Sequence, residues 1–231
     1  MSAEFLPFKS KHIGECAILY ATGPSLNDFD VSLLPETPDV AVGVNSVIYR
    51  DDIKLDYYFC AHDVSKEKKS HPHRKINNET PQLEKIKSRC GDMQVFCAVI
   101  FDGRPFKDFF TEEEANDMGA ITYALGSACA FQEDLAAGPM YGHSIVFPAL
   151  QFLLYTGVGR IYLVGCDCGG GASYLTPGVK WSDNVKWNWH EFLEFKNDVY
   201  SEVEVISVNP QGLVGVFRDY ITTEQGRDNV G

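Results

Sequence analysis

The chain has 231 residues, 45% of them hydrophobic and 23% charged, which indicates an ordinary globular protein with one sizeable core. Its net charge of −12 argues against a protein that binds nucleic acid through overall electrostatic attraction, because basic surfaces bind phosphate backbones. No apolar run reaches the roughly 20 residues of a membrane span, and the amino terminus lacks the apolar core of a signal peptide.

The cysteines and the absence of any linker-like segment bear on compartment and domain number. The seven cysteines form no CxxC pair and their number is odd, which predicts reduced thiols in an intracellular, cytoplasmic protein. Cys166 and Cys168 are too isolated to indicate a metal site. We expect a single domain over residues 1–231 and find no internal repeat.

The first third of the chain contains three apolar runs that each end in polar residues. Residues 15–21 predict a buried strand, and residues 39–45 and 56–63 predict the next two. The polar ends of these strands are Thr22, Gly23, Pro24 and Ser25 in the first, Asn45 in the second, and His62 with Asp63 in the third. The first turn is either a contact for phosphate or ribose or only a tight turn. Three such strand ends together form a candidate binding edge.

The middle of the chain carries weaker patterns. Residues 66–75 are charged and partly basic, which favours a solvated connection over a flap above an anionic donor. Residues 82–87 predict a short helix and residues 93–100 a fourth strand. Residues 106–119 indicate surface helix and turn, and the acceptor contacts are placed between residues 101 and 138 by elimination.

The stretch from Gly142 to Tyr174 has the pattern of half a nucleotide-binding unit. A turn of Gly142, His143 and Ser144 precedes an apolar helical pattern that stops at Thr156-Gly157, and we expect Ser144 to cap that helix. A buried parallel strand over 160–165 follows and leads to Asp167 and a glycine-rich loop. In open α/β sheets ligands bind beyond the carboxyl ends of the strands, so the GHS turn and the Asp167 loop should face one crevice.

The last third predicts a lid-like segment, a helix and a final strand. Residues 175–189 contain tryptophans, Pro177 and Gly178 without clear periodicity, which is typical of a lid. An amphipathic helix should begin at Trp189, and a strand should span 203–208. The whole pattern predicts a Rossmann-like, doubly wound α/β fold with a mostly parallel sheet and a lid-like segment near the C-terminal third.

Several motifs in order resemble a known family. They are GPSL after the first strand, Asn45, GHS before a helix, IYLVGCD, Tyr174, His190 and the closing VISVNPQGL. Over about residues 15–217 the chain resembles the bacterial lipooligosaccharide sialyltransferases, and also a related group that includes archaeal pterin pyrophosphokinases. The resemblance implies that residues 22–25 and Asn45 contact a cytidine nucleotide. It also implies that Tyr174 hydrogen-bonds the departing phosphate and that His190 is the general base on the acceptor hydroxyl.

The chain departs from the family pattern at several positions. Ala21-Thr22 replaces the usual glycine-asparagine type of pair, and Gly169 falls where a second phosphate-binding tyrosine is expected. His62-Asp63 replaces a simpler amide-bearing strand end, and together with Asp167 it would hold Mg²⁺ on a triphosphate in an alternative interpretation. Taken singly, His190 and His143 also fit surface histidines, Tyr174 fits a loop tyrosine, and Asp167 fits the cap of a turn.

These observations lead to one main functional hypothesis and two alternatives. The main hypothesis is a glycosyltransferase, sialyltransferase-like, that uses a nucleotide-activated sugar such as a CMP-linked acidic sugar and needs no obligatory metal. The alternatives are Mg²⁺-dependent pyrophosphate transfer from ATP to a pterin-like alcohol, and a nucleotide-binding protein without catalysis. The expected partners are the nucleotide-sugar donor and an acceptor that the sequence does not identify, without nucleic acid or a transmembrane segment. The sequence leaves a homo-oligomer open.

Overall fold

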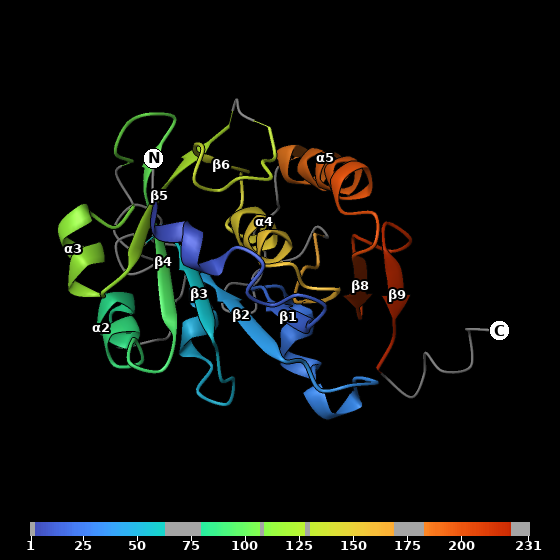
Figure 1. Cartoon of the computed structure of the whole chain (residues 1–231). Coiled ribbons are helices and arrows are strands. Elements are labelled where there is room, and N and C mark those ends of the chain that lie inside the picture. Colours follow the sequence, from blue (N-terminus) through green and yellow to red (C-terminus); the bar gives the residue numbers. More distant parts are fainter. Residues whose placement is uncertain (1–2, 63–79, 107–108, 128–129, 169–182, 223–231) are drawn as a thin grey trace.

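The computed structural model describes residues 3–62, 80–106, 109–127, 130–168 and 183–222, and for 183–186 only the backbone (Figure 1). Within these ranges, nine strands form one sheet. They are β1 (Cys16–Tyr20), β2 (Val40–Val44), β3 (Tyr57–Cys60), β4 (Gln94–Phe101), β5 (Ile121–Gly126), β6 (Met140–Tyr141), β7 (Arg160–Val164), β8 (Glu204–Val208) and β9 (Arg218–Tyr220).

Every neighbouring pair in this sheet is parallel, and the order across it is β6-β5-β4-β3-β2-β1-β7-β8-β9. The chain runs outward from β1 to β6, returns to the other side of β1 as β7, and continues outward to β9. The direction of winding therefore reverses between β1 and β7. This arrangement confirms the predicted doubly wound α/β class and makes the carboxyl ends of β1 and β7 the topological switch point.

The strands are buried on both faces, as their nearly continuous apolar sequences predict. In β1, Ala17 and Leu19 pack into the hydrophobic cluster on one face of the sheet, while Ile18 and Tyr20 pack into the cluster on the other. Full burial of each large apolar side chain contributes about 1.5–3 kcal/mol to folding. Two cores on opposite faces thus hold the central strands.

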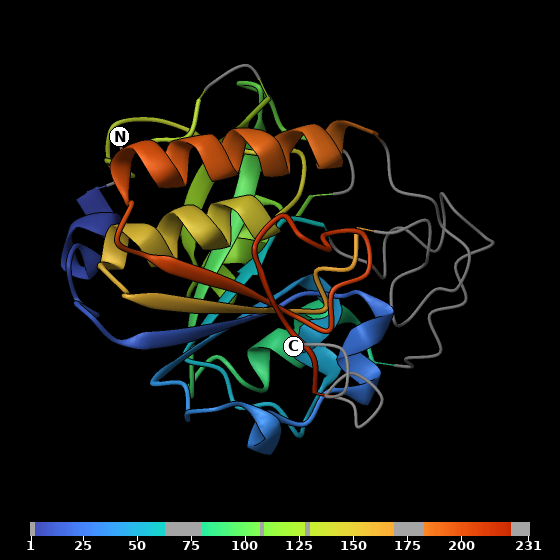
Figure 2. The same cartoon turned by 90° about the vertical axis from the view of Figure 1, so that its right-hand side faces the viewer.

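Helices cover both faces of the sheet. The 3₁₀ helices are η1 (Ala3–Phe8), η2 (Pro24–Asp28), η3 (Val31–Leu33) and η4 (Asn45–Tyr49), and the α-helices are α2 (Gln82–Lys87), α3 (Glu112–Asp117), α4 (Val146–Thr156) and α5 (Asp183–Val199). Residues of η1, α4 and α5 pack on one face, and residues of η2, η4, α2 and α3 on the other. Figure 2 shows α4 lying between the sheet and α5. In the described part, no helix combines the length and apolar character needed to cross a membrane.

The helix α4 is enclosed because α5 covers the side that faces away from the sheet. Phe147 of α4 lies against Trp189 of α5, with ring centroids 4.9 Å apart. The helix ends, as predicted, at Gly157, which adopts φ +84°. The predicted Ser144 cap is wrong: the residue before the helix is Ile145, and no side chain caps it. The backbone turns one residue earlier instead, where the Ser144 carbonyl accepts from the Phe147 N–H (3.1 Å).

Other differences from the sequence predictions lie where the patterns are short. The sequence analysis does not predict the strands β5, β6 and β9. The two residues of β6 and the three residues of β9 are too few to show a periodic pattern. The helix predicted to begin at Trp189 begins at Asp183, so residues 183–189 of the segment described as lid-like are helical. The remainder of that segment, residues 175–182, lies outside the described residues, as does the basic stretch 66–75.

Candidate functional site

Unusual backbone conformations gather at the carboxyl edge of the sheet. Within the described ranges, five residues other than glycine have positive φ, and four of them follow carboxyl ends of strands: Asn45 after β2, Asp102 after β4, Cys168 beyond β7 and Asn209 after β8. Left-handed conformation costs a non-glycine residue about 1–2 kcal/mol, although asparagine and aspartate tolerate it best. Conformations of this kind concentrate at functional sites, which draws attention to this edge.

The switch point is closed by contacts between the chain after β1 and the chain after β7. The Gly23 N–H donates to the Gly165 carbonyl (2.7 Å), and the Ser25 N–H donates to Asp167 Oδ2 (2.9 Å). The Ser25 hydroxyl also donates to Asp167 Oδ1 in a short hydrogen bond. A Cβ atom on Gly23 would lie 2.4 Å from both Asp167 Oδ2 and the Gly165 oxygen, so only glycine permits this approach. The structure therefore brings Ser25 and Asp167 of the predicted set together.

The contacts at the switch point use the backbone N–H groups that could otherwise donate to a phosphate. The N–H groups of Gly23, Ser25 and Leu26 all donate within the protein, and Pro24 has no N–H. The buried Asp167 carboxylate lies at the amino end of η2, where a bound anion would otherwise lie. A ligand at this turn therefore meets Thr22, which is half-buried, and oxygen acceptors.

Asn45 has an amide oxygen that the fold does not satisfy. Its Oδ1 atom is buried and has no hydrogen-bond partner among the described residues, and its φ is +47°. A buried acceptor without a partner costs about 1–3 kcal/mol, and a donor group on a ligand would recover that energy. The Asn45 carbonyl, in contrast, accepts from the Tyr58 hydroxyl (2.5 Å).

His62 belongs to a group of aromatic rings at the ends of β3 and β4. Its imidazole packs edge-on against Phe109 (centroids 4.7 Å apart) and lies 6.0 Å from Phe106, which is 48% exposed. Its neighbour Asp63 lies outside the described residues. Next to this group, the Asp102 carboxylate accepts from the N–H and the hydroxyl of Ser127, and these hydrogen bonds lower the pKa of Asp102.

The GHS turn is attached to α5 by a polar network. Gly142 has φ +140°, and a Cβ atom there would lie 2.7 Å from Phe147 Cβ. The N–H of the exposed His143 donates to Asn188 Oδ1 (3.2 Å), and Asn188 Nδ2 donates to Glu191 Oε2 (3.1 Å). Ser144, beside them, is half-buried.

The same network holds a carboxylate in its ionised form. Asn188 Nδ2 also donates to Tyr141 Oη (2.9 Å), and the Tyr141 hydroxyl donates to Glu191 in a short hydrogen bond. Burial raises the pKa of Glu191, but the hydrogen bonds from Tyr141 and Asn188 bring that pKa below its ordinary value. Sequence patterns gave no sign of Glu191 or Tyr141. Asp102, by contrast, follows the fourth predicted strand as Asn45 follows the second. A polar residue at that place is a sequence signal for a position at the carboxyl edge of the sheet.

Of the two residues that the resemblance makes catalytic, the structure describes only His190. His190 is exposed on α5 and shares its outer face with Trp187 and Glu194, whereas Trp189 and Phe192 face the core. Tyr174 lies outside the described residues. Within the described ranges, no three His, Cys, Asp or Glu side chains gather closely enough to hold a metal ion.

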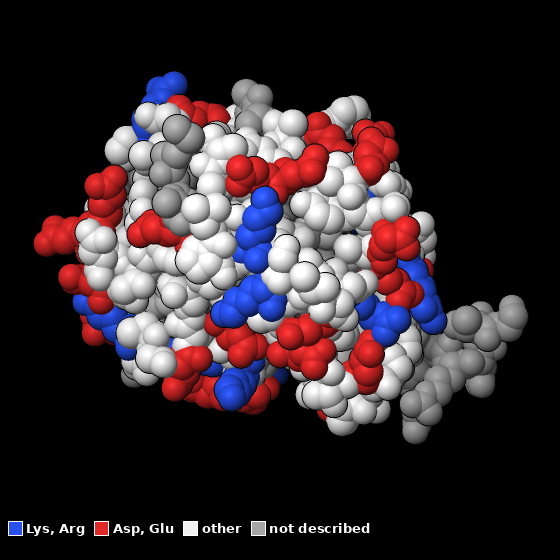
Figure 3. Space-filling model, in the orientation of Figure 1, with Lys and Arg blue, Asp and Glu red and all other residues white. Residues whose placement is uncertain are grey.

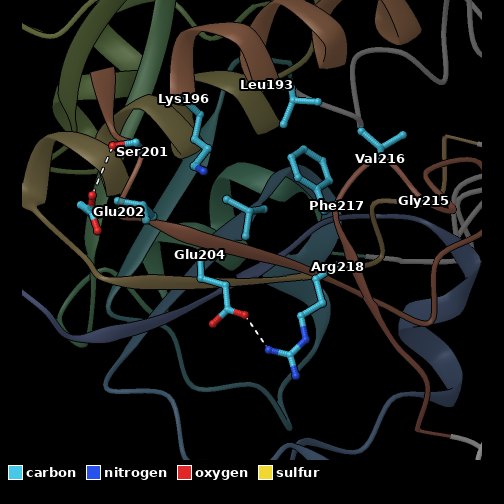
Figure 4. Close-up of a pocket in the computed structure, with 11 residues that line it drawn as sticks. Leu193, Lys196, Ser201, Glu202, Glu204, Gly215, Val216, Phe217 and Arg218 are labelled. Carbon is cyan, nitrogen blue, oxygen red and sulfur yellow. Dashed lines mark hydrogen bonds and ion pairs between the residues drawn. The ribbon is translucent and has the colours of Figure 1, made fainter. Parts of the chain in front are cut away.

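An open hollow lies between α5 and the strands β8 and β9 (Figure 4). Its volume is about 420 Å³. Leu193 and Phe217 supply apolar lining, and Arg218 at its rim pairs with Glu204 (2.6 Å). Of the predicted site residues that the structure describes, none lines it. The visible surface in Figure 3 carries acidic side chains around scattered basic ones, in keeping with the net charge of −12.

Comparison with known proteins finds structural similarity without sequence matches. No family model matches the chain, and no curated protein matches it by sequence. Among solved structures, the chain is similar to the sialyltransferase CstII from Campylobacter jejuni in complex with the substrate analogue CMP-3FNeuAc, at 14% identity and a TM-score of 0.49, over 88% of this chain and 85% of that one. A second structure of CstII, with cytidine-5'-monophosphate, gives 16% identity and a TM-score of 0.44, over 85% and 80% of the two chains. No residue role follows from likeness at this level.

Proposed function

We propose that the chain binds a nucleotide-activated sugar at the carboxyl edge of its sheet and transfers the sugar to an acceptor hydroxyl. The observation that carries the proposal is the unpartnered Asn45 Oδ1 at the end of β2, beside the switch point. In doubly wound nucleotide-binding folds, the residue at this place accepts a hydrogen bond from a ribose hydroxyl. An amide oxygen that is buried without a partner is suited to that contact.

The order of motifs supports glycosyl transfer as the reaction. GPSL, Asn45, GHS and IYLVGCD occur in the order that the sialyltransferase resemblance requires. The first three follow the carboxyl ends of β1, β2 and β6, and the fourth comprises most of β7 and the residues that follow it. We therefore propose a CMP-linked acidic sugar as the donor and no obligatory metal.

The chemistry requires two functions from the protein. A base must accept the proton of the acceptor hydroxyl, and hydrogen-bond donors must stabilise the charge that develops on the leaving phosphate. In this proposal His190 is the base and Tyr174 donates to the phosphate. A histidine is suited to the first role because an imidazole can accept a proton at neutral pH.

The proposal is tested by the nucleotides that stabilise the protein. Thermal unfolding is measured with CMP, CDP, UDP, GDP and ATP, each with and without Mg²⁺. A ligand present at about 100 times its Kd adds about 2.7 kcal/mol to the stability, which raises Tm by roughly 5–10 °C for a chain of this size. We expect the cytidine nucleotides to produce this shift without Mg²⁺.

Two variants connect the shift to the site. Asn45→Ala should weaken binding by about 1 kcal/mol or more, whereas Asn116→Ala, which removes an exposed amide on α3, should leave it unchanged. Stabilisation by none of the nucleotides would contradict the proposal. Stabilisation by ATP only in the presence of Mg²⁺ would instead favour pyrophosphate transfer.

A further inference from the structure

Two buried polar side chains connect α2 to the backbone carbonyl of Asn45. Tyr58 lies in the middle of β3 and is 0% exposed, as is Gln82, the first residue of α2. Gln82 Nε2 donates to Tyr58 Oη (2.9 Å), and Tyr58 Oη donates to the carbonyl of Asn45 (2.5 Å). Polar groups this deep in a core are expensive unless each hydrogen bond is made, so the two side chains are fixed in place.

The direction of the hydrogen bonds follows from the groups themselves. An amide nitrogen can only donate, so the contact from Gln82 occupies an acceptor position on the Tyr58 oxygen. The single hydroxyl proton of Tyr58 is then left for the Asn45 carbonyl. Burial raises the pKa of Tyr58 well above its ordinary value, which keeps that proton on the phenol.

Asn45 needs such support because its backbone is left-handed at φ +47°. The hydrogen bond from Tyr58 anchors the carbonyl of this residue, and the backbone in turn places the side-chain amide. We infer that Tyr58, held by Gln82, is a positioning residue that sets Asn45 Oδ1 to accept a ribose hydroxyl. This inference rests on the proposed nucleotide site and extends it to two residues with no exposed surface.

The test combines changes in the protein with changes in the ligand. Calorimetry gives the Kd of CMP, 2′-deoxy-CMP and 3′-deoxy-CMP for the native chain and for Tyr58→Phe. In the native chain, one of the deoxy analogues should bind about tenfold more weakly than CMP, the factor expected for one hydrogen bond. In Tyr58→Phe that factor should fall to about twofold or less, because a misplaced amide no longer distinguishes the analogues. General destabilisation would weaken all three ligands alike.

The chain offers a matched control in Tyr123. Its hydroxyl is also buried but has no hydrogen-bond partner among the described residues, so Tyr123→Phe removes the same atom without breaking a contact. The tenfold factor should persist in this variant. The Cα and Cβ chemical shifts of Asn45 give a second measurement, because they report its backbone conformation and should move in Tyr58→Phe and not in Tyr123→Phe.

The outcomes distinguish failure of the positioning role of Tyr58 from failure of the proposed function. An unchanged factor and unchanged Asn45 shifts in Tyr58→Phe would overturn the positioning role. Failure of the native chain to bind CMP would overturn the proposed function, and the Asn45 shifts would still decide whether Tyr58 positions this residue. If Tyr58→Phe does not fold, Gln82→Met removes the amide that donates to Tyr58, and the factor should then fall to about threefold to fivefold. A factor that stays at ten in Gln82→Met would count against the inference.

Discussion

The contact between Gly23 and Asp167 predicts a large effect from the smallest possible substitution. Gly23→Ala adds one methyl group where Asp167 Oδ2 and the Gly165 oxygen lie 2.4 Å from the new atom. Ordinary contacts of this type begin at 3.4 Å, so the chain after β1 must move away from β7 by about 1 Å. That movement opens the switch point.

The cost can be estimated from the contacts that the movement disturbs. Overpacking of a well-packed site typically costs about 1–3 kcal/mol, and weakening, without losing, a hydrogen bond to a charged group adds about 1 kcal/mol. We expect Gly23→Ala to lower the free energy of unfolding by about 2–4 kcal/mol in urea titrations. For a chain of this size, that corresponds to a loss of roughly 5–15 °C in Tm.

Gly91 provides the control for this prediction. A Cβ atom on Gly91 would have no neighbour within 4 Å, and its φ lies outside the range that strains other residues. Gly91→Ala should therefore be neutral or stabilise the protein by about 0.4–1 kcal/mol. If Gly23→Ala were as stable as Gly91→Ala, the close approach of the two strand ends would not exist in solution.

The remaining predictions concern charge and reactivity. His190→Ala should lower the rate of sugar transfer about a hundredfold or more with little change in nucleotide affinity, and nearly full turnover would show a structural histidine. The folded-state pKa of Glu191 is lowered, so its carboxylate stabilises the fold above the ordinary glutamate pKa, and this contribution is lost as the pH falls. Glu191→Gln should therefore make the stability depend less on pH on the acid side, which unfolding measurements over a range of pH would show. Burial, followed by the neighbouring Glu36, raises the pKa of Cys16 to about 12, so a thiol reagent at a pH of about 8 should modify the half-buried Cys90 well before it. Asp167→Asn should strengthen the binding of CMP relative to that of cytidine severalfold, because the repulsion that the carboxylate exerts on the phosphate across the ribose is removed; titration of both ligands measures this ratio.

The sequence was sufficient for the fold class because the central strands are buried on both faces. The buried positions of such strands are largely apolar, as in β1 and in β7 after Arg160, and charged residues then appear mainly at the ends. The same logic predicts from the sequence alone that Asn45 and Asp167 lie at the carboxyl edge. Short edge strands such as β6 carry too few residues to show a pattern, and they were missed.

The contacts that organise the site could not be predicted, because they join residues that are distant in the chain. Nothing in the run YYFC distinguishes Tyr58, whose hydroxyl reaches Asn45, from Tyr57, whose hydroxyl meets Lys11 at 2.9 Å on the opposite face of the sheet. The pairing of Ser25 with Asp167 likewise spans 142 positions in the sequence. Patterns predict which face of a strand a residue occupies, but the partner there depends on the packing of other elements.

The charge at the switch point constrains how a nucleotide can lie across the carboxyl edge. The buried Asp167 carboxylate already takes both donors of Ser25, so a phosphate beside it would meet a negative charge and few free donors. At about 4 Å and an effective dielectric constant of about 20, that repulsion is about 4 kcal/mol. Ribose hydroxyls, in contrast, donate to carboxylates and amides, and they suit the acceptors of Asp167 and Asn45. In the proposed complex, the electrostatics therefore favour the ribose at the ends of β1 and β2, with the phosphate directed away from the Asp167 carboxylate.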